Sequence, residues 1–279
     1  MPRAPLSCLK KKSDRFCCKF SRRLRHSQKP LNRRGPCETD LMKSPIHSIF
    51  LDAGNTLLFP QLEGLVQDLA RAGIRVKVEH FHQAEREGKR KLDEALWPQI
   101  RSGNVPRSSN GLYWTHYLSA LMEQIDAPES MRPTAIEIVV NRFRDIHTWS
   151  RVLPETVPVL TTLKSAGYSL AVISNSDGSV EGELQRSGLR KYLDFVIDSA
   201  IVGVEKPHPE IFQIALERAR LKPQEAIYVG DTYATDIGGA QLAGLRGVLL
   251  DRVGAYPEAS CPRITSLSHL TALLEKIRV

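Results

Sequence analysis

Short runs of apolar residues alternate with amphipathic stretches along most of the chain. Each run has the length of a strand and contains few polar residues, which is typical of strands buried on both faces of a parallel sheet. The five runs are Ser48–Asp52, Ser169–Ser174, Phe195–Asp198, Ala226–Gly230 and Gly247–Asp251. Helical patterns lie between them at Val157–Ala166, Pro209–Ala219 and Asp236–Ala243. The alternation predicts an α/β fold with a Rossmann-like parallel sheet and helices on both of its faces.

The segment between the first two of these strands is too long for a single crossover connection. Its apolar and charged residues recur with helical spacing in three stretches, Val78–Leu96, Trp114–Ile125 and Ile136–Ile146. We therefore expect an all-helical insert over residues 61–150, between two parts of the α/β core at residues 46–60 and 151–279. An insert that leaves the core at the strand ends is placed to cover a site there as a cap.

The charge of the chain is concentrated at its N-terminus. The formal net charge is +8, but residues 1–45 carry 13 Lys and Arg against 3 Asp and Glu, and the remaining residues carry 26 against 28. The first 45 residues also contain few apolar residues, so we expect a basic, disordered tail outside the core. Such a tail is compatible with an arm for nucleic acid or an anionic membrane, or with a transit peptide. The body of the chain has no electrostatic reason to bind nucleic acid.

The composition is that of an ordinary globular protein, with 42% hydrophobic and 25% charged residues. No apolar run approaches the roughly 18 residues needed to cross a bilayer, and none near the N-terminus resembles a signal-peptide core. Five cysteines without a CxxC pair do not suggest a disulfide framework or a zinc site. We expect a cytoplasmic protein without a membrane partner.

Polar residues follow several of the predicted strands directly. Because the carboxyl ends of parallel strands meet at one edge of a sheet, we expect these residues to gather there. They are Asp52 after the first strand, Ser174 and Asn175 at the end of the second, Lys206 before a helix, and Asp231 and Asp236 after the fourth. Together they supply carboxylates, a hydroxyl and an ammonium, which suit a divalent cation and a phosphoryl group.

The chemistry of phosphoryl transfer explains this choice of residues. A phosphate dianion repels a carboxylate nucleophile, so attack by Asp52 requires a hard cation bound by oxygen ligands, which Mg²⁺ prefers. Asp52 and Asp231 can provide those ligands. Lys206 can balance the remaining negative charge, and the Ser174 hydroxyl with nearby backbone N–H groups can hold the phosphate oxygens.

These motifs, in this order, resemble those of the haloacid dehalogenase-like (HAD) hydrolases, specifically the subfamily I members with a helical cap after the first motif. The resemblance covers about residues 46–275. Asp52 and Thr56 match the first motif, Ser174 the second, Lys206 the third, and Asp231 with Asp236 the acidic fourth.

The resemblance also implies roles for the individual residues. It implies that Asp52 becomes a covalent aspartyl-phosphate and that Lys206 orients it, with Mg²⁺ held by Asp52, Asp231 and the main-chain carbonyl of Gly54. It further implies that Asp236 supports the metal or its waters. Ser174, Asn175 and Lys206 are the expected phosphate-binding residues. The predicted activity is the Mg²⁺-dependent hydrolysis of a small phosphorylated metabolite.

One position departs from the phosphatase pattern. Phosphatases of the family carry a second Asp two residues after the nucleophile, as acid for the leaving group and base for water, and here that residue is Gly54. A backbone carbonyl is still present to contact a metal, but the proton shuttle is missing. Losing a positioned acid/base typically costs about 10²–10⁴ in rate.

Three explanations of Gly54 remain open. In the first, the hydrolase uses a proton from an insert histidine or a substrate with a good leaving group such as an acyl phosphate; the candidates are His80, His82, His116 and His147. In the second, the chain resembles the phosphonate-cleaving branch of the family, in which a cap lysine forms a Schiff base. The candidates there, Lys77, Lys89 and Lys91, lie in a stretch typical of a solvated face. In the third, the protein is a catalytically impaired phospho-ligand-binding or regulatory protein.

Overall fold

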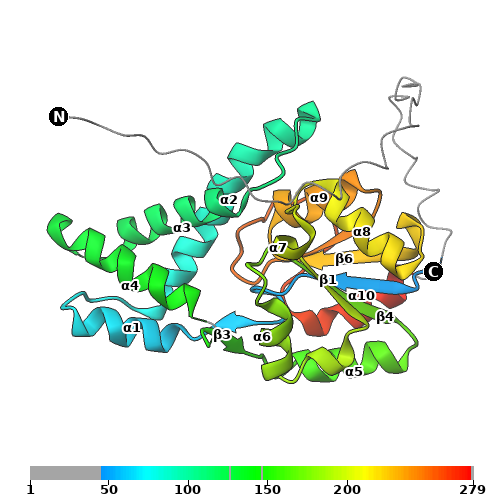
Figure 1. Ribbon diagram of the computed structural model, residues 1–279, viewed down its shortest axis with the longest axis horizontal. Helices are drawn as coiled ribbons and strands as arrows, with labels where there is room; N and C mark the ends of the chain where they lie inside the picture. Colours follow the sequence, from blue (N-terminus) through cyan, green and yellow to red (C-terminus); the bar gives the residue numbers. More distant parts are fainter. Residues whose placement is uncertain (1–44, 126, 146, 278–279) are drawn as a thin grey trace, which may run out of the picture. The chain divides into compact units, whose positions relative to one another are not determined.

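The computed structural model describes residues 45–125, 127–145 and 147–277, so the predicted basic tail lies almost entirely outside the described residues. Within this part, a six-stranded sheet has the order β5-β4-β1-β6-β7-β8, with every neighbouring pair parallel. Its strands are β1 (Ser48–Leu51), β4 (Ser169–Ser174), β5 (Phe195–Asp198), β6 (Ala226–Gly230), β7 (Arg246–Leu250) and β8 (Arg263–Ile264). The predicted α/β class is confirmed (Figure 1).

Two apolar layers cover the two faces of the sheet. Successive side chains of a strand point to opposite faces, so Ile49 and Leu51 of β1 pack in one layer and Phe50 in the other. The first layer includes residues of α5 (Thr156–Ser165), α6 (Val180–Arg186) and α10 (Leu270–Ile277). The second includes residues of α8 (Pro209–Ala219) and α9 (Gly239–Leu242). Both faces are therefore buried, which explains the nearly continuous apolar strand sequences.

The helices between β1 and β4 form an insert with a core of its own. A short antiparallel pair, β2 (Phe59–Pro60) with β3 (Trp149–Arg151), joins the two ends of this segment. The helices between them are α1 (Leu62–Arg71), α2 (Val78–Ser102), α3 (Asn110–Gln124) and α4 (Arg132–Arg144). Their apolar side chains make a separate cluster that includes Leu69, Phe81, Tyr117 and Val139. We call these four helices the helical insert.

Several elements were not predicted or differ from their predicted form. Helix α1 was not predicted, and the edge strand β8 is two residues long with only Ile264 buried, which is too short for a periodic signal. Helix α2 runs through Pro98, six residues past its predicted end, and stops at Gly103, which has a φ of 77°. It continues because Ile100 extends the apolar stripe that packs on Ala234.

The predicted helix Asp236–Ala243 is replaced by two shorter elements. A π-helical turn, Tyr233–Gly238, precedes α9. The wide turn brings the Asp236 side chain back toward β6, where its Oδ2 accepts a hydrogen bond from the Thr232 N–H at 2.9 Å. Gly230 leaves room for it, because a Cβ at this position would lie 2.5 Å from Cγ of Asp236. The helical period of the sequence does not reveal this local widening.

Among the described helices, none combines the length and the apolar character needed to cross a bilayer.

Close packing of α2 on α3 makes Gly88 a sensitive position. A Cβ there would lie 3.0 Å from the Cα and 3.2 Å from the backbone N of Tyr117, whereas a Cβ at Gly111 of α3 meets nothing within 4 Å. We expect Gly88→Ala to destabilise the protein by about 1–3 kcal/mol through overpacking, less the gain in helix propensity. Gly111→Ala is the matched control and should leave the melting temperature unchanged or slightly higher. Equal shifts for the two variants in thermal denaturation would contradict this account of the packing.

Candidate active site

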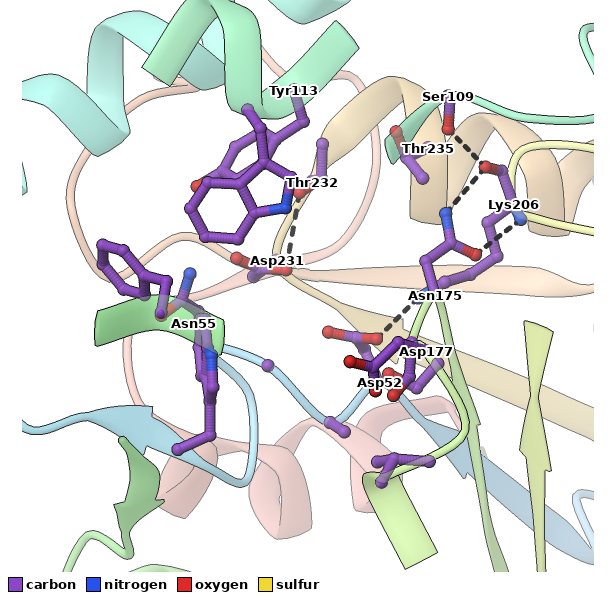
Figure 2. Close-up of a pocket in the computed structure, with 18 of the residues that line it drawn as sticks. Asp52, Asn55, Ser109, Tyr113, Asn175, Asp177, Lys206, Asp231, Thr232 and Thr235 are labelled. Carbon is purple, nitrogen blue, oxygen red and sulfur yellow. Dashed lines mark hydrogen bonds and ion pairs between the residues drawn. The ribbon is translucent and has the colours of Figure 1, made fainter. Parts of the chain in front are cut away.

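The sheet order places three of the predicted residues at one edge. β4, β1 and β6 are neighbours, and Ser174, Asp52 and Asp231 lie at or just beyond their carboxyl ends. A cavity of about 570 Å³ opens over this edge, lined by all three. Gly54, Asn175, Lys206 and Asp236 also line it. The structure therefore brings together every site residue expected from the sequence. Figure 2 shows Asp52, Asn175, Lys206 and Asp231 around this cavity.

Lys206 connects two of the carboxylates. Its ammonium is buried and donates to Oδ1 of Asp52 at 2.6 Å, to Oδ1 of Asp236 at 2.8 Å and to the hydroxyl of Tyr228 at 2.8 Å. Tyr228 in turn donates to the Ile173 carbonyl at 3.1 Å. Tyr228 is completely buried in β6, and the apolar pattern of that strand does not reveal its polar role.

Asn175 holds the backbone of Lys206. Its Oδ1 accepts from the Lys206 N–H at 2.8 Å, and its Nδ2 donates to the Lys206 carbonyl at 3.0 Å. The hydroxyl of Ser109, from the helical insert's segment before α3, donates to the same carbonyl at 2.6 Å (Figure 2). Both bonds of the Asn175 amide fix the loop that carries Lys206. These contacts give Asn175 a positioning role for Lys206, and its expected contact with phosphate stays a prediction.

The three aspartates fit a divalent cation. Asp52, Asp231 and Asp236 are buried, and one carboxylate oxygen from each lies within 4.8 Å of the others. Oxygen donors at this spacing suit Mg²⁺, which is bound by carboxylates together with waters and substrate oxygens. Both carboxylate oxygens of Asp236 already accept hydrogen bonds, one from Lys206 and one from the Thr232 N–H.

Burial and crowding raise the pKa of two of these carboxyl groups. Desolvation raises the pKa of Asp52 to about 7, an effect that the nearby Lys206 opposes and that Asp236 and Asp231 reinforce. Desolvation likewise raises the pKa of Asp231 to about 6, although Lys89 lowers it. Burial alone would lower the pKa of Lys206, but Asp236 and Asp52 raise it above its ordinary value. The metal-free site therefore holds carboxylates whose ionised forms are disfavoured.

The cavity wall facing Gly54 is aromatic. A Cβ on Gly54 would lie 3.5 Å from Cζ3 of Trp149, and Trp114 and Phe143 line the same cavity. Among the residues that line it in the described part of the chain there is no histidine. The four insert histidines proposed as proton donors, His80, His82, His116 and His147, are therefore not on the cavity wall.

Lys89 was misjudged from the sequence. It was expected on a solvated face, yet its side chain is 3% exposed and its Nζ lies 2.7 Å from Oδ2 of Asp231 and 2.6 Å from Oε1 of Glu85. A signal for this was present, because Glu85, Lys89 and Asp93 recur every four residues beside the apolar stripe of α2. Lys77 and Lys91 remain exposed or partly exposed, as expected.

The raised carboxyl pKa values predict how the metal-free protein responds to pH. A carboxyl group with a folded-state pKa above its ordinary value contributes stability below about pH 4, and this is lost as the pH rises through about 7 for Asp52. We expect the melting temperature in chelator to fall between pH 5 and pH 8. Asp52→Asn should reduce this fall and melt several degrees higher at pH 8, since about 1 kcal/mol corresponds to about 2–4 °C.

Asp194 provides the control for this prediction. Partial burial alone would raise its pKa, but hydrogen bonds from Lys164, Ser169 and the Leu170 N–H lower it. Asp194 thus contributes stability above about pH 4, and Asp194→Asn should lower the melting temperature at pH 8 or leave it unchanged. If the melting temperature of Asp52→Asn depended on pH in the same way as that of the wild type, the raised pKa of Asp52 would not explain the fall.

Comparison with known proteins agrees with the geometry of the site. Residues 46–244 match the family model of the haloacid dehalogenase-like hydrolases. The chain is 37% identical over 155 residues to haloacid dehalogenase-like hydrolase domain-containing protein 3 of Mus musculus, which covers 53% of this chain and 60% of the mouse protein. It therefore spans less than two thirds of that relative's length.

Other relatives match over more of their length. The chain is 30% identical over 219 residues to the glyceraldehyde 3-phosphate phosphatase of Methanopyrus kandleri, which covers 76% of this chain and 87% of that protein. A solved structure, the HAD phosphatase from Thermococcus onnurineus, has a TM-score of 0.52 and 25% identity over 84% of this chain and 100% of that chain. These matches agree with the carboxylates at the strand ends and with the buried Lys206. The chain therefore belongs to the haloacid dehalogenase-like hydrolases.

Proposed function

We propose that the protein is a Mg²⁺-dependent phosphatase that hydrolyses a small phosphorylated metabolite through an aspartyl-phosphate at Asp52. The observation that carries the proposal is the grouping of Asp52, Asp231 and Asp236 around one possible cation position, with Lys206 bonded to Asp52. The similarity to a relative named as a glyceraldehyde 3-phosphate phosphatase supports the same reaction type. The helical insert then acts as the cap that encloses the substrate.

Each residue of the site has its own role in the proposed reaction. Lys206 binds Oδ1 of Asp52 and fixes the carboxylate, so that Oδ2 attacks phosphorus while the bond to the leaving oxygen breaks. Ser174 lines the cavity, and its hydroxyl would hold a phosphate oxygen. Water then attacks phosphorus, the bond between phosphorus and Oδ2 of Asp52 breaks, and both protons of the water leave on the released phosphate, so that Asp52 is regenerated as a carboxylate. A Mg²⁺ ion held by Asp52, Asp231 and the Gly54 carbonyl would neutralise the negative charge of the phosphoryl group.

The surroundings of Gly54 narrow the choice of substrate. Residue 54 supplies no acid, and the nearest side chain to its missing Cβ is the apolar ring of Trp149. We therefore propose a leaving group that departs as an anion without taking a proton, as from an acyl phosphate or the ester of an acidic alcohol. The aromatic wall of Trp114, Phe143 and Trp149 suits a leaving group with apolar surface.

The contacts of the insert lysines do not support the phosphonate-cleaving alternative. Schiff-base formation needs an unprotonated amine that reaches the substrate. Lys89 pairs with two carboxylates, Asp231 and Glu85, which raise its pKa well above the ordinary value against the opposing effect of burial. Neither Lys89, Lys77 nor Lys91 lines the cavity.

Removal of the nucleophile tests the proposed reaction. We expect wild-type protein with Mg²⁺ to release inorganic phosphate from a panel of acyl phosphates and phosphomonoesters, and Asp52→Asn to reduce this by at least about 10³. Asp198→Asn is the matched control, because Asp198 also ends a buried strand but caps α7 (Ser199–Val202) and does not line the cavity. Absence of turnover by the wild type across the panel, with phosphate still bound, would favour the impaired binding protein instead.

A second experiment restores the missing acid. A Cβ at residue 54 makes only an ordinary contact with Trp149, and Gly54 is not among the residues with positive φ, so the backbone accepts Asp there. We expect Gly54→Asp to raise the rate on alkyl phosphates by about tenfold or more, and to weaken the dependence of kcat/KM on leaving-group pKa.

Gly54→Asn is the control for shape, because it has the same size but no acid. An equal gain in the Asn variant, or no change in the leaving-group dependence for the Asp variant, would show that proton donation at residue 54 does not limit the reaction.

A further inference from the structure

Helix α2 of the insert contacts the turn that carries Asp236 and lies shortly after Asp231. Oδ1 of Asp93 accepts the Ala234 N–H at 3.0 Å, and the rings of Trp97 and Tyr233 have their centroids 5.0 Å apart. Ile100 completes an apolar contact on Ala234. One face of α2 therefore lies against the π-helical turn Tyr233–Gly238, immediately after Asp231.

Lys89 lies on the same face of α2, one turn before Asp93. Its ammonium is buried between Oδ2 of Asp231, at 2.7 Å, and Oε1 of Glu85, at 2.6 Å. Leu92 of α2 lines the substrate cavity, and Lys89 is not among the lining residues. Lys89 reaches the site through its ion pair with Asp231, which does line the cavity.

We propose that Lys89 is a built-in counter-cation of Asp231 that competes with the divalent cation for this carboxylate. In the metal-free protein the ammonium satisfies Asp231 and ties the helical insert to the core at this point. The inference rests on the metal site of the proposed function and goes beyond it, because it assigns control of metal affinity to a residue of the insert.

Distance and burial make the competition strong. A Mg²⁺ ion bound at Oδ2 of Asp231 lies at most about 5 Å from Nζ, given an ordinary Mg–O distance of about 2.1 Å. Two cations at this separation repel each other, and the repulsion is large where little water is present to screen it. The ion must therefore either displace the ammonium from Oδ2 or bind in spite of the electrostatic repulsion between the two cations.

Glu85 sets how tightly the ammonium is held on Asp231. It is the second carboxylate on Lys89 and lies on the preceding turn of α2, with its side chain 15% exposed. When a metal takes Asp231, Glu85 retains the ammonium, so Lys89 is not left as an unpaired buried charge. This arrangement lets the same lysine serve both the metal-free and the metal-bound protein, and it couples metal binding to the contacts of α2 with the core.

Calorimetric titration of the purified full chain with MgCl₂ tests the proposal without relying on activity. We expect Lys89→Met to bind Mg²⁺ about tenfold more tightly than wild type or better. Lys89→Arg keeps the charge and should stay near the wild-type affinity. Lys91→Met is the matched control, because Lys91 lies two residues further along α2, partly exposed against Glu123, and its loss should change nothing.

Glu85→Gln keeps the test decisive if Lys89→Met does not fold. With Glu85 neutral, the ammonium is left to Asp231 alone, so Mg²⁺ affinity should fall. The proposal is overturned if Lys89→Met binds Mg²⁺ no more tightly than wild type. It is likewise overturned if Glu85→Gln binds Mg²⁺ as tightly as wild type or more tightly. In either case Lys89 would support Asp231 as a metal ligand and would not compete with the metal. Turnover that depends on Asp52, measured in parallel, would in that case leave the proposed function standing. Absence of Mg²⁺ binding in every variant, wild type included, would overturn the metal site and this proposal together.

Discussion

The structure of the site depends on holding three carboxylates close together in a buried position. Asp52, Asp231 and Asp236 would repel one another there, and desolvation adds to the cost of their charges. Two buried ammonium groups make the arrangement stable, Lys206 between Asp52 and Asp236 and Lys89 on Asp231. The excess of negative charge that remains at the edge of the sheet is what a hard cation with a bound phosphoryl group would neutralise.

The two lysines reach the carboxylates from different parts of the chain. Lys206 belongs to the α/β core, but the backbone that carries it is held by Asn175 and also by Ser109 of the insert's α2–α3 connection. Lys89 belongs to the insert itself. The insert therefore does more than line the cavity, because it contacts both the backbone of the lysine bound to Asp52 and a metal-ligand candidate. Hydrogen bonds and an ion pair thus connect the insert directly to the site.

Much of the core was predictable because its signals are local. Strands buried on both faces must be apolar along their whole length, and the parallel arrangement then brings Asp52, Ser174 and Asp231 to one edge. The failures occur where a distant contact changes a local preference. Helix α2 passes through Pro98 because Ile100 has a partner on Ala234, and the turn after Asp231 widens because Asp236 bonds back to the Thr232 N–H.

From the sequence alone we could predict the five central strands in their chain order, the insert between the first two of them, and the identity of the polar residues at the strand ends. These follow from periodicity and from residue chemistry, which are readable one segment at a time. Three features are evident only in the folded structure: Asn175 holds the backbone of Lys206, Tyr228 joins the polar network, and Lys89 is buried on Asp231. The surroundings of a charged side chain depend on segments far away in the chain, so periodicity along one helix cannot distinguish a solvated lysine from a buried counter-ion.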